Sequence, residues 1–175
     1  AYNIFGSNGI LFNHESPRRG ETFVTKKIIK ALVRIKMGYQ KQLVLGNLDS
    51  KRDWGHARDY VEAMWKILQQ KKPDDYVIAT GKQYSIRQFI NFVAKKLNMK
   101  IVWKGKGLNE IGYDASNKKN IVLVDKNYIR PLDVNTLLGN AAKARRELKW
   151  KPQTNIHTLI DEMINEEMNI LSNDQ

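Results

Sequence analysis

Residues 57–103, ARDYVEAMWKILQQKKPDDYVIATGKQYSIRQFINFVAKKLNMKIVW, decide the fold class. Apolar residues recur with helical spacing over 57–70 and again after Ser85, whose hydroxyl is typical of a helix cap. Each helix is followed by a short apolar run, at 76–79 and at 101–103, that is typical of a strand. Strands that alternate with helices of this length predict a layered α/β fold.

The same alternation extends outward in both directions. Helices are expected at 23–37 (capped by Thr22), at about 140–148 (capped by Asn140) and at about 155–171, and strands at 3–12, 43–45 and 121–124. The polar stretch 104–120 is expected to be an irregular, mobile insertion. The order of the strands in the sheet cannot be predicted from this pattern.

Each predicted helix has an apolar stripe that is expected to face the core. For the helix at 57–70 the stripe consists of Val61, Met64, Trp65 and Leu68, and for the helix after Ser85 of Ile86, Phe89, Ile90, Val93 and Leu97.

Composition limits the class of protein. The chain has 175 residues, of which 42% are hydrophobic and 27% charged, as in a globular domain rather than a disordered chain. No apolar run approaches the roughly 18 residues that a membrane-spanning helix needs. The absence of cysteine excludes disulfides and thiolate zinc sites and fits a cytoplasmic location. A net charge of +12 makes a polyanion or a phosphorylated ligand a sensible partner.

The first candidate site is basic. Residues 17–42 contain eight Lys or Arg and one acidic residue, Glu21, around a glycine-containing loop that leads into the first helix. A helix N-terminus with nearby Arg18, Arg19 and Lys27 could bind a phosphate. The alternative is a solvated helix face, on which Lys26, Lys30 and Arg34 recur every four residues.

The second candidate is Lys51-Arg52-Asp53-Trp54-Gly55-His56. The planar guanidinium of Arg52 could bind a phosphate or a carboxylate, Asp53 could orient it, and Trp54 could wall a pocket. Alternatively, Trp54 fills the core and Asp53 caps the following helix. The spacing does not decide between these hypotheses.

The third candidate is the turn around Arg130 and Pro131. An arginine held by a rigid proline turn could bind an anion, and Asp133 could bind sugar hydroxyls. A surface turn in which the arginine and the aspartate pair with each other is the alternative.

Several chemistries lack the residues that they need. The three histidines lie far apart in sequence, so no metal site is expected. The sequence contains no G-x-G-x-x-G, no G-x-x-x-x-G-K-[ST] and no G-x-S-x-G.

Three segments together resemble the GDP-mannose 4,6-dehydratases, a group of the extended short-chain dehydrogenase/reductase family. They are Asn13-His14-Glu15-Ser16-Pro17-Arg18-Arg19-Gly20, then Leu45-Gly46-Asn47-Leu48-Asp49 continuing to Ala57, and Asp59-Tyr60-Val61-Glu62-Ala63-Met64-Trp65. The likeness continues through Ile78–Gly81 and Tyr128–Pro131 to Pro152 and covers essentially the whole chain.

The resemblance implies an α/β chain that is the C-terminal part of such an enzyme. Residues 1–175 would form the substrate-binding portion, with 1–12 and parts of 40–80 belonging to the Rossmann layer. The N-terminal NADP-binding half, with its Gly-rich loop, Thr–Glu pair and Tyr-x-x-x-Lys dyad, is absent, so no catalytic residue is expected in this chain, which alone is predicted to be inactive.

The family's reaction converts GDP-mannose into GDP-4-dehydro-6-deoxy-D-mannose, a precursor of GDP-L-fucose, with loss of water. NADP takes a hydride from the sugar and returns it to C6. The resemblance places His14 and Arg19 near NADP, and it places Asn13, Val24, Lys27, Arg52 and Arg130 around GDP-mannose. Asp133 stands where the family usually has Glu, one methylene longer. The resemblance also implies that Lys26, Lys30 and Arg34 are surface residues.

Two further expectations follow. The charged tips of Arg19, Lys27, Arg52 and Arg130 are expected to converge on one pyrophosphate-sized cleft. The partners are expected to be GDP-mannose and either further copies of the chain or the missing half, without nucleic acid or membrane.

Two competing hypotheses remain. The charge of +12 would suit a nucleic-acid-binding module, but the sequence places Trp54, Trp65 and Trp103 in stripes, strands or motif loops rather than on an exposed basic platform. A truncated remnant that acts only through association is the other hypothesis.

Overall fold

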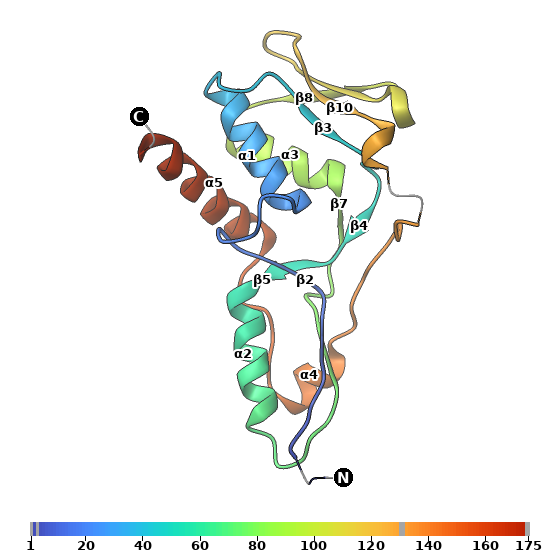
Figure 1. Cartoon of the computed structure of the whole chain (residues 1–175), viewed down its shortest axis with the longest axis vertical. Coiled ribbons are helices and arrows are strands. Elements are labelled where there is room, and N and C mark those ends of the chain that lie inside the picture. Colours follow the sequence, from blue (N-terminus) through green and yellow to red (C-terminus); the bar gives the residue numbers. More distant parts are fainter. Residues whose placement is uncertain (1, 3, 130–131, 174–175) are drawn as a thin grey trace.

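At one end of the molecule three helices share a core with a four-stranded sheet, and at the other end two helices share a core with a pair of strands (Figure 1). This computed structural model describes residues 2, 4–129 and 132–173. The α/β class that the sequence predicts is confirmed. In the part of the chain that is described, no helix is long and apolar enough to cross a bilayer.

We call the three helices and the four-stranded sheet the upper group, and the two helices and the strand pair at the other end the lower group. The upper group is built on a mixed sheet of order β3-β10-β9-β8. Strand β10 runs parallel to β3 and antiparallel to β9, which in turn is antiparallel to β8. The strands are β3 (Leu43–Leu45), β8 (Ile101–Lys104), β9 (Ile111–Asp114) and β10 (Asn120–Val124), and the helices are α1 (Val24–Lys36), α3 (Ile86–Lys96) and α5 (Ile156–Asn173). The side chains of Ile28, Phe89 and Leu159 form the centre of its core.

The lower group has a separate core. It consists of the parallel strands β1 (Gly9–Leu11) and β6 (Tyr76–Ile78) and the helices α2 (Ala57–Leu68) and α4 (Ala142–Glu147). Tyr60 and Trp150 lie at the centre of this core. Their rings meet edge to face, with 6.2 Å between the ring centroids. Three separate stretches of the chain therefore form it: the strand near the N-terminus, residues 57–79 and residues 141–150.

Two short strand pairs connect the groups (Figure 1). Strand β2 (Asn13–Glu15) is parallel to β5 (Trp54–His56), and β4 (Lys51–Arg52) is antiparallel to β7 (Tyr84–Ser85). Single 3-10 turns, η1 (Gly107–Asn109) and η2 (Lys126–Tyr128), complete the elements of the described residues.

Helix starts follow the sequence signals only in part. Ser85 caps α3 as predicted, and Gln88 completes a capping box by accepting from the Ser85 backbone N–H. The prediction for Asn140 is wrong by one residue, because Ala141 is the N-cap residue of α4, although Asn140 Oδ1 accepts from the N–H of Ala142. The prediction for Thr22 is wrong, because Phe23 is the N-cap residue of α1 and provides no side-chain hydrogen bond.

The prediction of one strand over 3–12 is wrong in extent, because strand geometry is limited to Gly9–Leu11. Residues 4–6 are exposed, so apolar character there does not reflect burial.

The prediction that 104–120 is irregular is wrong. Strand β9 lies in this stretch and pairs with β8 on one side and β10 on the other. A Cβ added at Gly112 would lie 3.0–3.1 Å from side-chain atoms of Trp103, Ile101 and Val122. The glycine therefore allows close packing of the neighbouring strands, whereas in the sequence it suggested a loop.

Helix α2 is confirmed, but its apolar stripe does not face the core. Val61, Met64, Trp65 and Leu68 are exposed, and the buried side is formed by Asp59, Tyr60, Ala63 and Ile67. Trp65 is 62% exposed, which also overturns its expected place in a buried stripe.

Candidate functional site

A cavity of about 340 Å³ opens where strand β1 ends. Its lining consists of Ile10, Leu11, Phe12, Asn13, His14, Arg19 and Leu137. Asn13 and His14 follow the carboxyl end of β1, which is parallel to β6. Ligands of α/β sheets bind beyond the carboxyl ends of parallel strands, so this is a candidate binding site.

His14 has a defined tautomer. Its Nδ1 lies 3.0 Å from the carbonyl oxygen of Phe12, which can only accept, so Nδ1 carries the proton and donates. In the neutral ring Nε2 is then a hydrogen-bond acceptor. The ring centroid lies 5.3 Å from that of Tyr60, which connects the site to the lower core.

Arg19 is held by two contacts. Its Nε lies 3.1 Å from Oε2 of Glu15, and its guanidinium carbon lies 3.5 Å from the centroid of the Phe23 ring. Thr25 Oγ1 donates to the same Glu15 oxygen at 2.6 Å. Burial raises the pKa of Glu15 above its ordinary value, although Thr25 and Arg19 oppose this shift.

This buried carboxyl predicts a pH dependence. The wild type is expected to lose stability relative to Glu15→Gln as the pH rises from about 4.5 through the raised pKa of Glu15. The folded state binds more protons than the unfolded state in that range, so deprotonation favours unfolding. Urea denaturation of both proteins at a series of pH values measures the effect, and a difference that stays constant with pH would contradict it.

Lys27 lies in a different cavity, of about 330 Å³. Its Nζ is 4.0 Å from the centroid of the Tyr128 ring, and burial lowers its pKa. A Cβ added at Gly46 would lie 2.2 Å from the carbonyl oxygen of Tyr128, so this glycine lets η2 approach the end of β3. Val24, the first residue of α1, packs against the upper core.

Arg52 and Asp133 form an ion pair, with Arg52 Nη2 and Asp133 Oδ1 2.7 Å apart. Arg52 Nη1 also donates to the carbonyl oxygens of Lys51 at 2.8 Å and Val134 at 2.6 Å. Ser50 Oγ donates to the other Asp133 oxygen at 3.1 Å. Asp133 thus orients the guanidinium of Arg52. Arg130 lies outside the described residues, so its predicted role and its pairing are not described.

The structure brings together only some of the predicted site residues. Asn13, His14 and Arg19 line one cavity, Lys27 lines another, and Arg52 binds Asp133. The expected convergence of the four cations on one cleft is wrong for Arg19 and Lys27, which line separate cavities, and Arg130 lies outside the described residues.

The alternatives for residues 53 and 54 are resolved. Trp54 fills the upper core and does not wall a pocket. Asp53 neither orients Arg52 nor caps α2: its carboxylate accepts from the backbone N–H groups of Thr80, Gly81 and Gly139. His56 is the residue that caps α2, and it accepts from the N–H of Arg58.

Lys26 was expected at the surface with Lys30 and Arg34, and this prediction is wrong for Lys26. It is 4% exposed, and its Nζ lies 3.4 Å from Oε2 of the buried Glu167 on α5. Arg34 also approaches Glu167, with its Nε 3.7 Å from Oε1. Helical spacing placed these cations on one face but could not show that α5 covers part of it.

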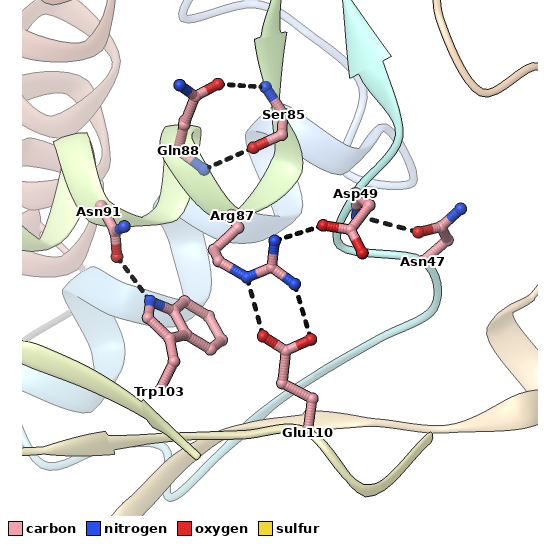
Figure 2. A network of polar contacts seen from close by, with 8 residues as sticks. All are labelled: Asn47, Asp49, Ser85, Arg87, Gln88, Asn91, Trp103 and Glu110. Carbon is pink, nitrogen blue, oxygen red and sulfur yellow. Dashed lines mark hydrogen bonds and ion pairs between the residues drawn. The ribbon is translucent and has the colours of Figure 1, made fainter. Parts of the chain in front are cut away.

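Sequence reasoning also missed the network around Arg87 (Figure 2). Arg87 binds Glu110 through two hydrogen bonds, of 2.8 and 2.6 Å, and it also pairs with Asp49. The Asp49 N–H in turn donates to Asn47 Oδ1 at 2.9 Å. The network fixes the loop after β3 between α3 and β9. No short-range spacing signals it, because Arg87 and Glu110 lie 23 residues apart.

A larger cavity, of about 840 Å³, lies at the C-terminal ends of α1 and α3. Lys36, Lys41 and Lys119 are among its lining residues, but none of the predicted site residues that the structure describes is. Helix C-termini carry partial negative charge, which disfavours an anion there. We therefore place the candidate site at β1 and β4 instead.

Comparison with known proteins agrees with this fold. The sequence model of the family described as GDP-mannose 4,6 dehydratase matches residues 1–163. The chain is 50% identical over 174 residues to GDP-mannose 4,6 dehydratase 2 of Caenorhabditis elegans, covering 99% of this chain and 45% of the relative. It is 51% identical over 171 residues to the GDP-mannose 4,6-dehydratase of Sinorhizobium fredii, covering 98% of this chain and 49% of the relative.

Among solved structures, the chain is similar to RMD from Pseudomonas aeruginosa complexed with NADPH, with a TM-score of 0.74 and 20% sequence identity. The match covers 93% of this chain and 48% of that one, and it shows the fold alone. This agrees with the expected C-terminal part of an extended short-chain dehydrogenase/reductase fold. The chain spans about half the length of the curated relatives that it matches. By the extent of the family match, the chain belongs to the GDP-mannose 4,6-dehydratase family.

Proposed function

We propose that this chain supplies the nucleotide-sugar half of a GDP-mannose 4,6-dehydratase. The observation that carries the proposal is the family match over residues 1–163, a range that contains every proposed substrate contact. The family match leaves the nucleic-acid alternative without support. A cytoplasmic location remains our expectation from the absence of cysteine.

The proposed substrate site combines residues of the strand pairs β2–β5 and β4–β7 with residues of helix α1. Arg52 would bind the diphosphate, because its side chain is already oriented by Asp133 and the carbonyl of Val134. Lys27 would add a positive charge, and Asn13 and Val24 would contact the substrate. Arg130 would also bind it, in the part of the chain that the structure does not describe. Asp133 would serve this site by orienting Arg52. We assign it this role in place of a direct contact with the sugar.

NADP is the proposed cofactor, and it would supply hydride transfer when bound. His14 and Arg19 lie in a cavity of about 340 Å³, which suits one end of a dinucleotide. The sequence contains no glycine-rich dinucleotide fingerprint, so the rest of the cofactor would be held by another polypeptide segment. We therefore assign cofactor contact, but no catalytic step, to this chain, and expect it to be inactive alone.

The division into layers follows the two cores. We assign β1, α2 and β6 to the edge of the cofactor-binding layer and the upper group to the nucleotide-sugar domain. Within residues 40–80, only the stretch from α2 onward belongs to that layer, since β3 pairs with β10 in the upper sheet.

Calorimetric titration tests the substrate site. Arg52→Ala is expected to weaken GDP binding by about ten- to a hundredfold, as expected for loss of a charge-assisted hydrogen bond. Arg52→Lys keeps the charge but not the planar guanidinium, so its affinity for GDP is expected to lie between those of the wild type and Arg52→Ala. The control is Arg58→Ala, whose side chain is 75% exposed.

Two results contradict the proposal. One is GDP binding no tighter than mannose binding to the wild type. The other is equal GDP affinity in the wild type and in both Arg52 variants, provided that their circular dichroism spectra agree.

A further inference from the structure

Residues 48–52 connect β3 with β4 and carry the arginine of the proposed substrate site. Arg52 Nη2 lies 2.7 Å from Asp133 Oδ1, and Ser50 Oγ donates to the other Asp133 oxygen at 3.1 Å. Because both contacts with Asp133 come from this segment, the place of residues 48–52 sets the direction in which the Arg52 guanidinium points.

The start of α3 holds the segment from the other side. The N–H of Ile86 donates to the carbonyl oxygen of Ser50 at 3.1 Å. The N–H of Arg87 donates to the carbonyl oxygen of Leu48 at 3.0 Å. The Arg87 side chain pairs with Asp49, which lies between them. Two residues of α3 therefore bind three consecutive residues of the segment, directly before β4.

The Arg87 side chain is itself fixed by the upper group (Figure 2). Its Nε and Nη2 donate to the two oxygens of Glu110 at 2.8 and 2.6 Å, and Glu110 is 7% exposed and directly precedes β9. The guanidinium carbon lies 5.6 Å from the centroid of the Trp103 ring, whose indole N–H donates to Asn91 of α3 at 3.0 Å. A bidentate pair with a buried carboxylate fixes the plane of the guanidinium, and this directs Nη1 toward Asp49.

Stabilisation of α3 does not account for an arginine at this place. Ile86 is the first helical residue and Arg87 the second, and the first turn contains no acidic residue. The positive end of the helix dipole lies there and favours an acidic side chain over a cation. Arg87 is therefore explained by its two carboxylate partners, Glu110 and Asp49, which belong to other elements.

We propose that Arg87 is a positioning residue for Arg52. It holds residues 48–50 in the place from which the Arg52 guanidinium meets a diphosphate. This proposal rests on the function proposed above, in which Arg52 binds the diphosphate of the substrate. The contribution of Arg87 is preorganisation, because a side chain that is already ordered loses less conformational entropy when it binds a ligand.

Calorimetric titration with GDP tests the role of Arg87. Arg87→Lys keeps the charge but not the planar guanidinium, and we expect it to weaken GDP binding about three- to tenfold, on the scale of ordering one long side chain. The matched control is Arg146→Lys, because the Arg146 side chain is 69% exposed and pairs with its neighbour Glu147 on α4. The control is expected to bind GDP as the wild type does.

A double-mutant cycle separates positioning from a general loss of stability. If Arg87 acts through Arg52, Arg87→Lys has nothing left to disturb once Arg52 has been replaced by alanine. Arg52→Ala and the double variant Arg52→Ala with Arg87→Lys are therefore expected to bind GDP with affinities equal to within about twofold.

A second variant disturbs the network at its exposed end. The Asp49 side chain is 75% exposed, so Asp49→Asn leaves the core intact while it removes the charged acceptor of Arg87 Nη1. We expect it to weaken GDP binding about two- to threefold, in the same direction as Arg87→Lys.

Nuclear magnetic resonance gives a readout that does not depend on GDP. The Nε–Hε signal of Arg52 is assigned by its loss in Arg52→Lys, and its order parameter reports fast motion of the guanidinium. Arg87→Lys and Asp49→Asn are each expected to lower this order parameter, whereas Arg146→Lys is expected to leave it unchanged.

The outcomes separate the two proposals. An unchanged order parameter of Arg52 in both network variants overturns the positioning role, and so does a weakening of GDP binding by Arg87→Lys that persists in full without Arg52. A wild type that does not bind GDP overturns the proposed function, and the order parameter then decides on the positioning role by itself. GDP binding that is equal in the wild type, Arg87→Lys and Asp49→Asn overturns the positioning role and leaves the proposed function intact.

Discussion

Glu167→Ala is expected to lower the free energy of unfolding by about 3–5 kcal/mol, among the largest effects of any single substitution in this chain. Glu167 and Lys26 are both almost fully buried, at the contact between α5 and α1, with 3.4 Å between the charged atoms. Removing the carboxylate leaves the ammonium group of Lys26 without its counter-charge in a poorly solvated place. Urea denaturation followed by circular dichroism measures the loss.

Two controls identify the cause. Glu166→Ala changes the exposed neighbour on the same helix, and we expect its effect to stay within about 0.5 kcal/mol. The double variant Lys26→Met with Glu167→Leu removes both charges, and it is expected to recover most of the lost stability, because buried pairs are often replaceable by apolar residues. A double variant as unstable as Glu167→Ala would contradict this explanation.

Asp53→Ala is expected to lower the free energy of unfolding by at least about 3 kcal/mol, because three backbone donors each lose their acceptor at a cost of about 1–3 kcal/mol. The Asp53 carboxylate is fully buried and accepts from the N–H groups of Thr80 and Gly81, each at 2.9 Å, and from that of Gly139 at 3.2 Å. The carboxylate therefore joins three chain segments between the two groups. Urea denaturation again measures the effect.

Asp53→Asn retains one carbonyl oxygen as an acceptor and is expected to lose less than Asp53→Ala. Asp161→Ala is the exposed control, since Asp161 forms a surface pair with Lys96 and such pairs contribute about 0–1 kcal/mol. Equal stability of Asp53→Ala and Asp161→Ala would show that the buried carboxylate does not hold the segments together.

The helices were predictable because helical periodicity is a local signal. The boundaries of α3 follow from Ser85 and from an apolar stripe that is in fact buried. Helix α2 shows the limit of this reasoning: spacing groups Val61, Met64, Trp65 and Leu68 on one face, but it cannot tell what covers that face. The core side of α2 includes Ala63 and the polar Asp59, which a search for large apolar residues overlooks.

The strands were less predictable, because their pairing partners lie far apart in sequence. Strand β9 contains Gly112 and lies in a polar stretch, and only its neighbours β8 and β10 identify it as a sheet strand. Short strands such as β4 and β5 resemble loop in the sequence for the same reason.

The sequence predicted which residues belong to the candidate site, but not how their side chains are arranged in space. Motifs located Asn13, His14 and Arg52, but the partner of Arg52 is 81 residues away, at Asp133. In the sequence, pairing within the turn at 130–133 was one of two alternatives for Asp133. The burial of Lys26 was also hidden, because it depends on Glu167 in the last helix.

The interleaved cores set the order of events during biosynthesis. The lower core closes only when Trp150 packs against Tyr60, with its indole N–H donating to the carbonyl oxygen of Asp59 at 2.8 Å. The upper core closes only when α5 packs on α1. Both events need residues from 141 onward, so a nascent polypeptide cannot complete either core before this stretch has been synthesised.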